Sequence, residues 1–147
     1  MNLFNLLDVS GSALLAERQR AEVVATNLAN AETTRTPGGG PYQRQEVVFG
    51  TLRVTAPSFG DVFDSAADNA VRGVQVTKVV TDPAPPIRRY DPSNPDANSQ
   101  GFVDYPAINP AEETVDMIEA SRAYQLNVDA VQATKQMITQ ALTIVTS

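Results

Sequence analysis

Few side chains in this chain could carry chemistry, because the sequence contains neither cysteine nor histidine. Their absence excludes a thiol nucleophile, a cysteine-ligated zinc site and an imidazole general base. Paired carboxylates remain, at Glu112 with Glu113 and at Asp64 with Asp68. The first pair is typical of a helix start, where acids favour the positive end of the dipole, and we interpret the second as a solvated loop or turn. We therefore predict no enzymatic activity, no catalytic residue and no cofactor or metal site.

A run of three glycines, Gly38–Gly40, is the other feature with a chemical interpretation, since glycine-rich loops can cradle a phosphate group. A phosphate loop would continue into Lys-Ser or Lys-Thr between a strand and a helix. Neither the dipeptide nor that context is found here. The surrounding threonines and prolines favour a simple turn.

The charge balance limits the possible partners. There are 11 Lys and Arg residues against 17 Asp and Glu, which gives a formal net charge of −6. Without a basic stripe, nucleic acid is not an expected partner. No apolar run approaches the ~20 residues that span a membrane, so direct membrane insertion is not expected. Residues 1–9 lack the basic region, apolar stretch and cleavage site of a signal peptide, and we expect no cleavable signal.

The strongest structural pattern is an amphipathic helix from Asn109 to Ser147. Asn109 is a good N-cap, Pro110 suits the first helical position, and Glu112 follows at the third. Apolar residues then recur every seven positions, with a companion row four positions later. The first row is Met117, Tyr124, Val131, Ile138 and Val145, and the companion row is Ser121, Val128, Lys135 and Leu142. We predict that these two rows form a helix-packing seam.

This helix is too long to be only the cap of a small globular domain. At 1.5 Å per residue it would extend roughly 57 Å, beyond the ~30 Å of a small domain. A second apolar row, at Ala123, Ala130, Met137 and Ile144, indicates more than one neighbour. Lys135 interrupts the seam, so we predict that it pairs with an acid of the partner helix or an adjacent subunit, or extends outward to solvent.

A second helix is predicted from about Asn5 or Asp8 to Asn30. Its heptad positions are Leu7, Leu14, Ala21 and Leu28. The pattern alone also fits an ordinary amphipathic core helix. Two long terminal helices with matching rows, however, favour a pair that joins the chain ends into one coiled-coil-like stalk.

The middle of the chain favours short strands and irregular structure. We predict strands at residues 42–49, 52–54 and 74–81 as part of a small sheet, and leave residues 58–72 open between a helical turn and a loop. The proline-rich stretch 83–95 predicts a stiff extended segment without regular structure, followed by a short extended piece at 101–106. The predicted fold is therefore α+β, with a helical domain of residues 1–31 and 109–147 and a β-rich outer region of residues 32–108.

Two stretches resemble the terminal signatures of the flagellar axial proteins, which form the rod, the hook and the hook-associated segments. They are Ser10–Leu14 with Ala25–Ala31 near the N-terminus, and Met117–Val128 near the C-terminus. In the middle, Pro41-Tyr42, the segment Tyr90–Pro95 and Gly101-Phe102-Val103 are similar to the short proximal-rod members. Thr26 and Leu126 depart from this family pattern, which usually has Ser and Ala at these positions.

The resemblance implies a structural subunit that assembles head-to-tail into a helical drive shaft, transmitting torque from the membrane ring to the distal rod and hook. Implied partners are other copies of the chain, other rod proteins, membrane-ring and ring–rod junction proteins, and the flagellar export apparatus. The implied location is the periplasmic rod of the basal body, reached without a cleaved signal. Taken with the two seam rows, it predicts helix-seam and subunit-interface contacts at Leu7, Leu14, Ala21, Asn27, Leu28, Asn30, Met117, Ser121, Arg122, Tyr124, Gln125, Asn127, Val128, Val131, Ile138, Leu142 and Val145.

Two other functions remain open from the sequence. One is a periplasmic adaptor or binding module of coiled-coil type, whose helical pair docks on a different machine. The other is a carboxylate hydrolase acting on cell-wall glycan, which would need two acids facing one cleft.

Overall fold

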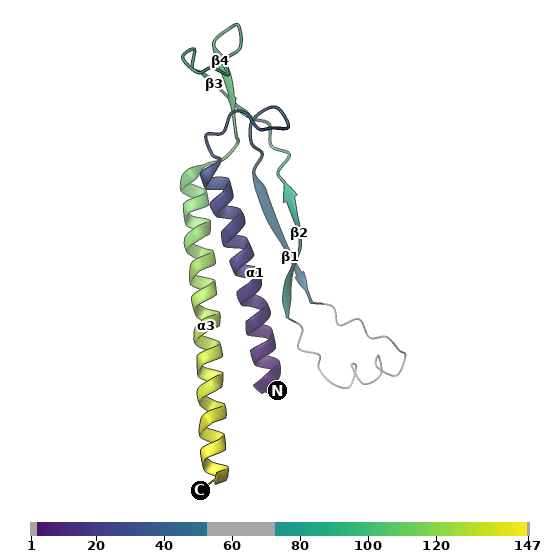
Figure 1. Ribbon diagram of the computed structural model, residues 1–147, viewed down its shortest axis with the longest axis vertical. Helices are drawn as coiled ribbons and strands as arrows, with labels where there is room; N and C mark the ends of the chain where they lie inside the picture. The colour runs from purple at the N-terminus through teal and green to yellow at the C-terminus, as the bar shows by residue number, and fades with distance from the viewer. Residues whose placement is uncertain (1–2, 53–72, 147) are drawn as a thin grey trace, which may run out of the picture.

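The computed structural model describes residues 3–52 and 73–146, and shows an elongated molecule with three parallel layers (Figure 1). Two long helices and a two-stranded ribbon lie side by side, and a second small hairpin stands beyond their upper end. The α+β class is confirmed. The strand predicted at residues 52–54 lies partly outside the residues that the structure describes, and the segment 58–72 lies wholly outside them.

Helix α1 spans Leu3–Ala29 and helix α3 spans Pro110–Thr146. The two helices pack against each other along α1 and run in opposite directions. At 1.5 Å per residue, α1 is about 40 Å long and α3 about 55 Å, so α3 extends past the start of α1 (Figure 1). The prediction of two long terminal helices is confirmed, with α1 beginning slightly earlier than expected.

The start of α3 is set by its cap. The Asn109 side chain accepts a hydrogen bond from the Ala111 amide at 3.1 Å, and its carbonyl accepts the Glu113 amide at 3.1 Å. Pro110, which has no amide hydrogen to lose, occupies the first helical position. The predicted cap is confirmed.

Strands β1 (Gln45–Thr51) and β2 (Val74–Thr81) form an antiparallel ribbon with a register shift between Val48 and Phe49. The ribbon packs on the side of α1 opposite α3. A side chain of α1 holds it at each end. Asn27 binds the Gln45 backbone, and the Ser12 hydroxyl accepts the Val74 amide at 3.1 Å while donating to the Val9 carbonyl. The first strand was predicted at residues 42–49 and is observed at Gln45–Thr51, a few residues later in the chain.

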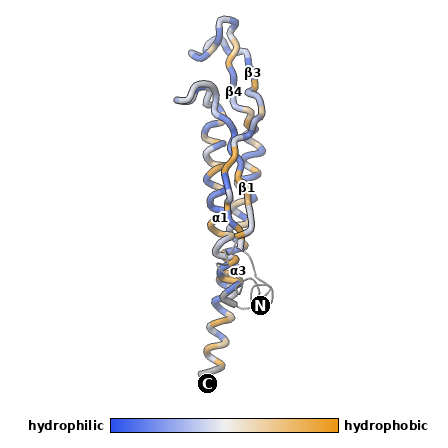
Figure 2. Tube along the Cα trace, turned by 90° about the vertical axis from the view of Figure 1, so that its right-hand side faces the viewer, coloured by the Kyte–Doolittle hydropathy of each residue, from blue (hydrophilic) through white to orange (hydrophobic). Residues whose placement is uncertain are grey.

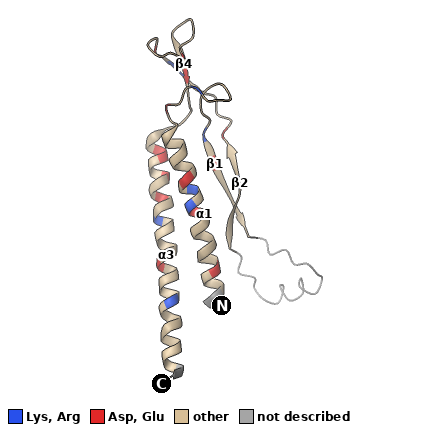
Figure 3. Cartoon of the chain, viewed as in Figure 1, with Lys and Arg blue, Asp and Glu red and all other residues tan. Residues whose placement is uncertain are grey.

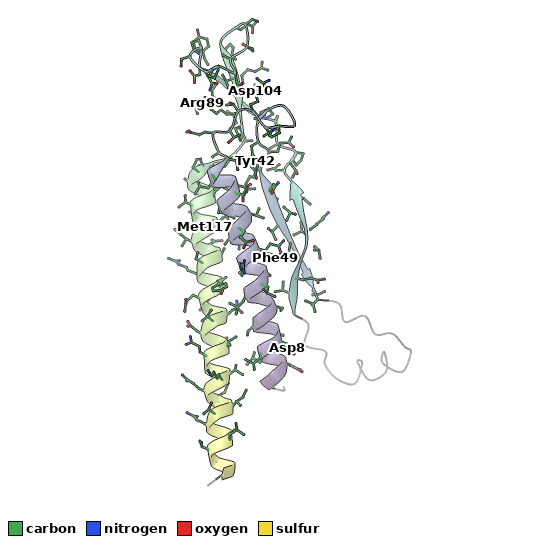
Figure 4. All side chains as sticks on the ribbon, in the orientation of Figure 1. Asp8, Tyr42, Phe49, Arg89, Asp104 and Met117 are labelled. Carbon is green, nitrogen blue, oxygen red and sulfur yellow. The ribbon has the colours of Figure 1, made fainter. Side chains whose placement is uncertain are left out.

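A second antiparallel hairpin joins β3 (Ile87–Tyr90) to β4 (Phe102–Tyr105). The prediction that residues 83–95 hold no regular element is wrong, because the four residues between Pro86 and Asp91 are free to donate backbone hydrogen bonds. The expected extended piece at 101–106 supplies the partner strand. Arg89 lies over the Tyr105 ring at 4.9 Å, and Tyr90 meets Phe102 edge to face. Figure 4 shows Arg89 with Asp104 in this hairpin.

The buried core is thin for a chain of this size. Among the described residues, the buried apolar side chains are Ala16, Val24, Val103, Pro106, Ile108 and Ala120. Hydropathy alternates along both helices, and apolar positions continue down α3 (Figure 2). Within the same residues, neither helix has an apolar stretch long enough to cross a membrane.

The strands form two separate two-stranded ribbons, whereas the sequence predicted one small sheet.

The loop between the hairpin strands depends on Gly101. Its φ is +80°, and an added Cβ would lie 2.8 Å from the Tyr90 ring. We expect Gly101→Ala to lower the free energy of local hairpin opening by about 1 to 2 kcal/mol. Hydrogen exchange at the β4 amides would then be roughly tenfold faster. Gly38→Ala is the control, because only the Thr36 hydroxyl lies near its added Cβ, at 4.0 Å. Equal exchange in both variants would contradict the expectation.

Candidate assembly interface

The contact between the helices lies along one face of α3. Glu113, Ala120 and Thr134 are each at most 1 % exposed, and Asn127, which continues the same heptad row, is half-buried. This row lies four residues before the predicted first row, about 40° around the helix. Within one chain, the face that meets α1 is therefore not centred on the predicted seam.

The predicted interface residues fall into groups in the single chain. Asn27 is buried. Leu7, Leu14, Ala21, Asn30, Met117, Asn127, Val128, Val131 and Ile138 are half-buried. Leu28, Ser121, Arg122, Tyr124, Gln125 and Leu142 are exposed. The side chain of Val145 lies outside the described residues. Lys135 is also exposed, which agrees with the outward alternative predicted for it.

A buried polar cluster joins α1, the start of β1 and α3. Asn27, 1 % exposed, donates through Nδ2 to the Gln45 carbonyl at 2.8 Å and to Glu113 Oε2 at 3.1 Å. Its Oδ1 accepts from the Gln45 amide at 2.9 Å and from the Tyr42 hydroxyl at 3.1 Å. All the hydrogen-bonding capacity of this amide is used within the protein. Figure 4 places Tyr42 where the upper ends of the helices meet the ribbon.

Two arginines complete the cluster. Arg44 Nε contacts Glu113 Oε1 at 2.5 Å, its Nη2 lies 3.5 Å from Asp116, and it also pairs with Glu46. Arg20 of α1 contacts the other oxygen of Asp116 at 3.2 Å. Because Glu113 is 1 % exposed, its charge requires the contacts with Arg44 and Asn27. Figure 3 shows that charged residues gather on the upper part of both helices.

Burial raises the pKa of Tyr42, and the nearby Glu113 carboxylate raises it further. For Arg44, burial lowers the pKa, but the hydrogen bond and charge of Glu113, followed by Glu46, outweigh it, so the net direction is upward. The cluster therefore holds a neutral phenol and a guanidinium that keeps its charge. Nothing in it offers a general base paired with a nucleophile.

The sequence reasoning missed most of this cluster. The sequence indicated Glu113 only as a first-turn acid and Arg20 and Tyr42 only as residues of the family motifs, and it indicated no role for Arg44. The sequence did contain a signal for the burial of Glu113. Glu113 and Ala120 are seven residues apart and belong to the heptad row that packs against α1. The contact between Arg44 and Glu113 joins residues 69 positions apart, and no local pattern indicates such a pair.

The rest of α3 leaves apolar side chains in solvent on both sides of the α1 contact. Val115 is 55 % exposed, Leu126 69 % and Met137 46 % on one side. Tyr124 is 41 % exposed and Leu142 60 % on the other. Helix geometry places these two sets on separate faces that flank the buried row. Such surface is typical of a subunit that packs against further helices.

Comparison with known proteins bears on both helices. Residues 7–35 match the family described as "Flagella basal body rod protein", and residues 99–144 match "Flagellar basal body rod FlgEFG protein C-terminal". The flagellar basal-body rod protein FlgC of Borreliella burgdorferi is 41 % identical over 98 % of this chain and 98 % of its own length. The chain belongs to the FlgC family of flagellar basal-body rod proteins. The predicted family resemblance is confirmed over nearly the whole chain.

Other FlgC proteins agree with this assignment. That of Bacillus subtilis is 40 % identical over 98 % of this chain and 99 % of its own length, and that of Salmonella typhimurium is 37 % identical over 98 % of each. These are structural rod proteins of a non-enzymatic family. The chain is accordingly a structural subunit of the flagellar rod and not an enzyme, and the adaptor alternative is not favoured.

The buried carboxylate gives a stability prediction. We expect Glu113→Ala to lower the free energy of unfolding by about 2 to 3 kcal/mol, because Arg44 and Asn27 would lose a buried partner. Glu112→Ala is the matched control. Glu112 is exposed in the same helical turn, and its loss should cost at most about 1 kcal/mol. Chemical denaturation of the purified chains measures both values. Equal losses would show that the cluster does not stabilise the fold.

Tyr42 gives a pH prediction. The upward pKa shift favours the neutral phenol in the folded chain. Its contribution to stability is therefore complete below the unfolded pKa of about 10 and is lost as the pH rises through the higher folded pKa. We expect the free energy of unfolding to fall above about pH 10 more steeply in the wild type than in Tyr42→Phe, because that variant has no phenol to ionise. Parallel curves in alkaline denaturation experiments would contradict this.

Proposed function

We propose that the chain forms part of the proximal rod, assembling head-to-tail with other copies and other rod proteins into a helical drive shaft. In this role it transmits torque from the membrane ring to the distal rod and hook within the periplasm. The observation that carries the proposal is the exposed apolar surface on two separate faces of α3. A subunit with two different adhesive faces joins its neighbours by heterologous contacts, which generate open helices when they do not close.

A drive shaft must resist bending and twisting, and the polar cluster supports that requirement. Asn27, Arg44 and Glu113 connect α1, the ribbon and α3 by directional contacts at one level. Ser12 holds the far end of the ribbon to α1. Both attachments limit sliding between the layers. We propose that the helical pair becomes a coiled-coil-like layer when neighbouring subunits cover the remaining faces of α3.

The further partners follow from the same role. A proximal subunit contacts proteins of the membrane ring and of the ring–rod junction, and it reaches the rod through the flagellar export apparatus without a cleaved signal. The membership of the chain in the FlgC family supports these proposals. The thin core also supports export as an unfolded chain, since few buried apolar contacts have to be broken.

The two faces of α3 can be tested separately. We expect Tyr124→Asp and Leu126→Asp each to abolish motility and rod assembly while the purified chain remains helical. Each substitution places a charge where a neighbour is expected to exclude water, at a cost of several kcal/mol. Gln136→Asp, exposed on the outward face, is the control and should leave motility intact. Swimming assays and electron microscopy of basal bodies are the measurements. Normal rods in both test variants would refute the role of these faces.

A further inference from the structure

The two apolar faces of α3 that flank the α1 contact differ in charge. We name as the acidic flank Glu112, Val115, Glu119, Leu126 and Met137, and as the basic flank Tyr124, Val128, Val131, Lys135 and Leu142. At 100° per residue each set falls within one narrow sector of the helix. Arg122 and Asp129 lie at the outer border of the acidic flank. Lys135 is the charged member of the basic flank. The lower part of α3 carries little other charge (Figure 3).

The acidic flank has charge to offer a neighbour. Glu119 is 60 % exposed in its side chain, and its contact within the chain is a 3.5 Å approach to Arg20. That arginine lies closer to Asp116, at 3.2 Å. The acidic flank also has a hollow of about 450 Å³ lined by Ala111, Glu112, Val115 and Asp116, with room for an apolar side chain.

We infer that the basic flank of one copy docks on the acidic flank of a second copy in parallel orientation, with Lys135 paired to Glu119. This inference rests on the proposed rod function and specifies its lateral contact. The pairing displaces the two helices by sixteen residues. The same displacement sets Val131 beside Val115 and Leu142 beside Leu126, so two apolar pairs form on either side of the ion pair, and it sets the half-buried Val128 beside Glu112.

The other exposed acid of the acidic flank does not give this match. Pairing Lys135 with Glu112 displaces the helices by seven more residues, which sets Leu142 against Glu119. An apolar side chain would then cover a carboxylate. Each register sets one apolar side chain against a carboxylate, but only the displacement of sixteen residues also forms two apolar pairs within α3. The larger displacement places Val131 at Ile108, before the helix begins, so the sixteen-residue register is the one inferred.

The register has a geometric consequence for the assembly. Sixteen residues of α-helix correspond to an axial displacement of about 24 Å between the two copies. Because the two flanks are different surfaces, each copy uses its basic flank on one neighbour and its acidic flank on another. The contact is heterologous and continues around a helix without closing a pair.

The chain contains no native cysteine, so disulfide crosslinking tests the register directly. The chain carrying Lys135→Cys with Glu119→Cys replaces the native protein in motile cells, and their basal bodies are purified and oxidised. Leu126→Cys with Leu142→Cys is a second pair in the same register, independent of charge. Both pairs should give a species of twice the chain mass that disappears on reduction, since disulfides need Cβ atoms within about 4.5 Å.

The control is Lys135→Cys with Glu112→Cys, one heptad out of register, together with each single variant. None of these should give the doubled species. Crosslinking in the control pair, none in either test pair, or a crosslink to a protein of different mass would overturn the inference. In those cases the chain is still found in basal bodies, so the rod function stands. Absence of the wild-type chain from purified basal bodies would instead overturn the proposed function itself.

Discussion

The buried contact between Glu113 and Arg44, closed by Asn27, is the interaction on which the arrangement of the three layers depends. It lies where α1, α3 and the beginning of β1 meet, and Glu113 and Asn27 are almost fully removed from solvent. An apolar core of this thickness tolerates sliding of one helix along another, because apolar contacts have little directional preference. Charged hydrogen bonds require specific distances and angles. The cluster therefore fixes the axial level of the helices and the ribbon.

In the rest of the described chain, few apolar side chains are buried in a core and many large ones lie on the surface. Small residues such as Ala16 and Ala120 let the helices approach closely, and larger apolar residues such as Leu126 face outward. A single chain consequently gains modest stability from burial. The same side chains contribute fully when neighbours cover them, so a rod can be stiff although its free subunit is marginally stable. Mass action links the stability of the subunit to its assembly.

The charged residues make the two ends of this apolar surface chemically different. Acids concentrate in the first turns of α3, where the helix dipole favours them, and Lys135 lies far down the helix. One helix thus presents chemically different faces at different levels. Such asymmetry favours parallel, staggered neighbours over symmetric pairs, which is the requirement of a continuous shaft.

The sequence by itself determined the two terminal helices, the Asn109 cap, the α+β class and the family, because heptad spacing, capping residues and terminal signatures are local patterns. The tertiary structure decided which face of α3 meets α1. Hydrophobic periodicity favoured the row of Met117 and Tyr124, but small and polar residues at Glu113, Ala120 and Thr134 are the ones buried. The buried face of α3 is determined by residues distant in sequence, since Arg44 neutralises Glu113 and the small side chains allow close helix packing. Hydrophobic periodicity is a local pattern and carries no information about pairs of residues so far apart in the sequence.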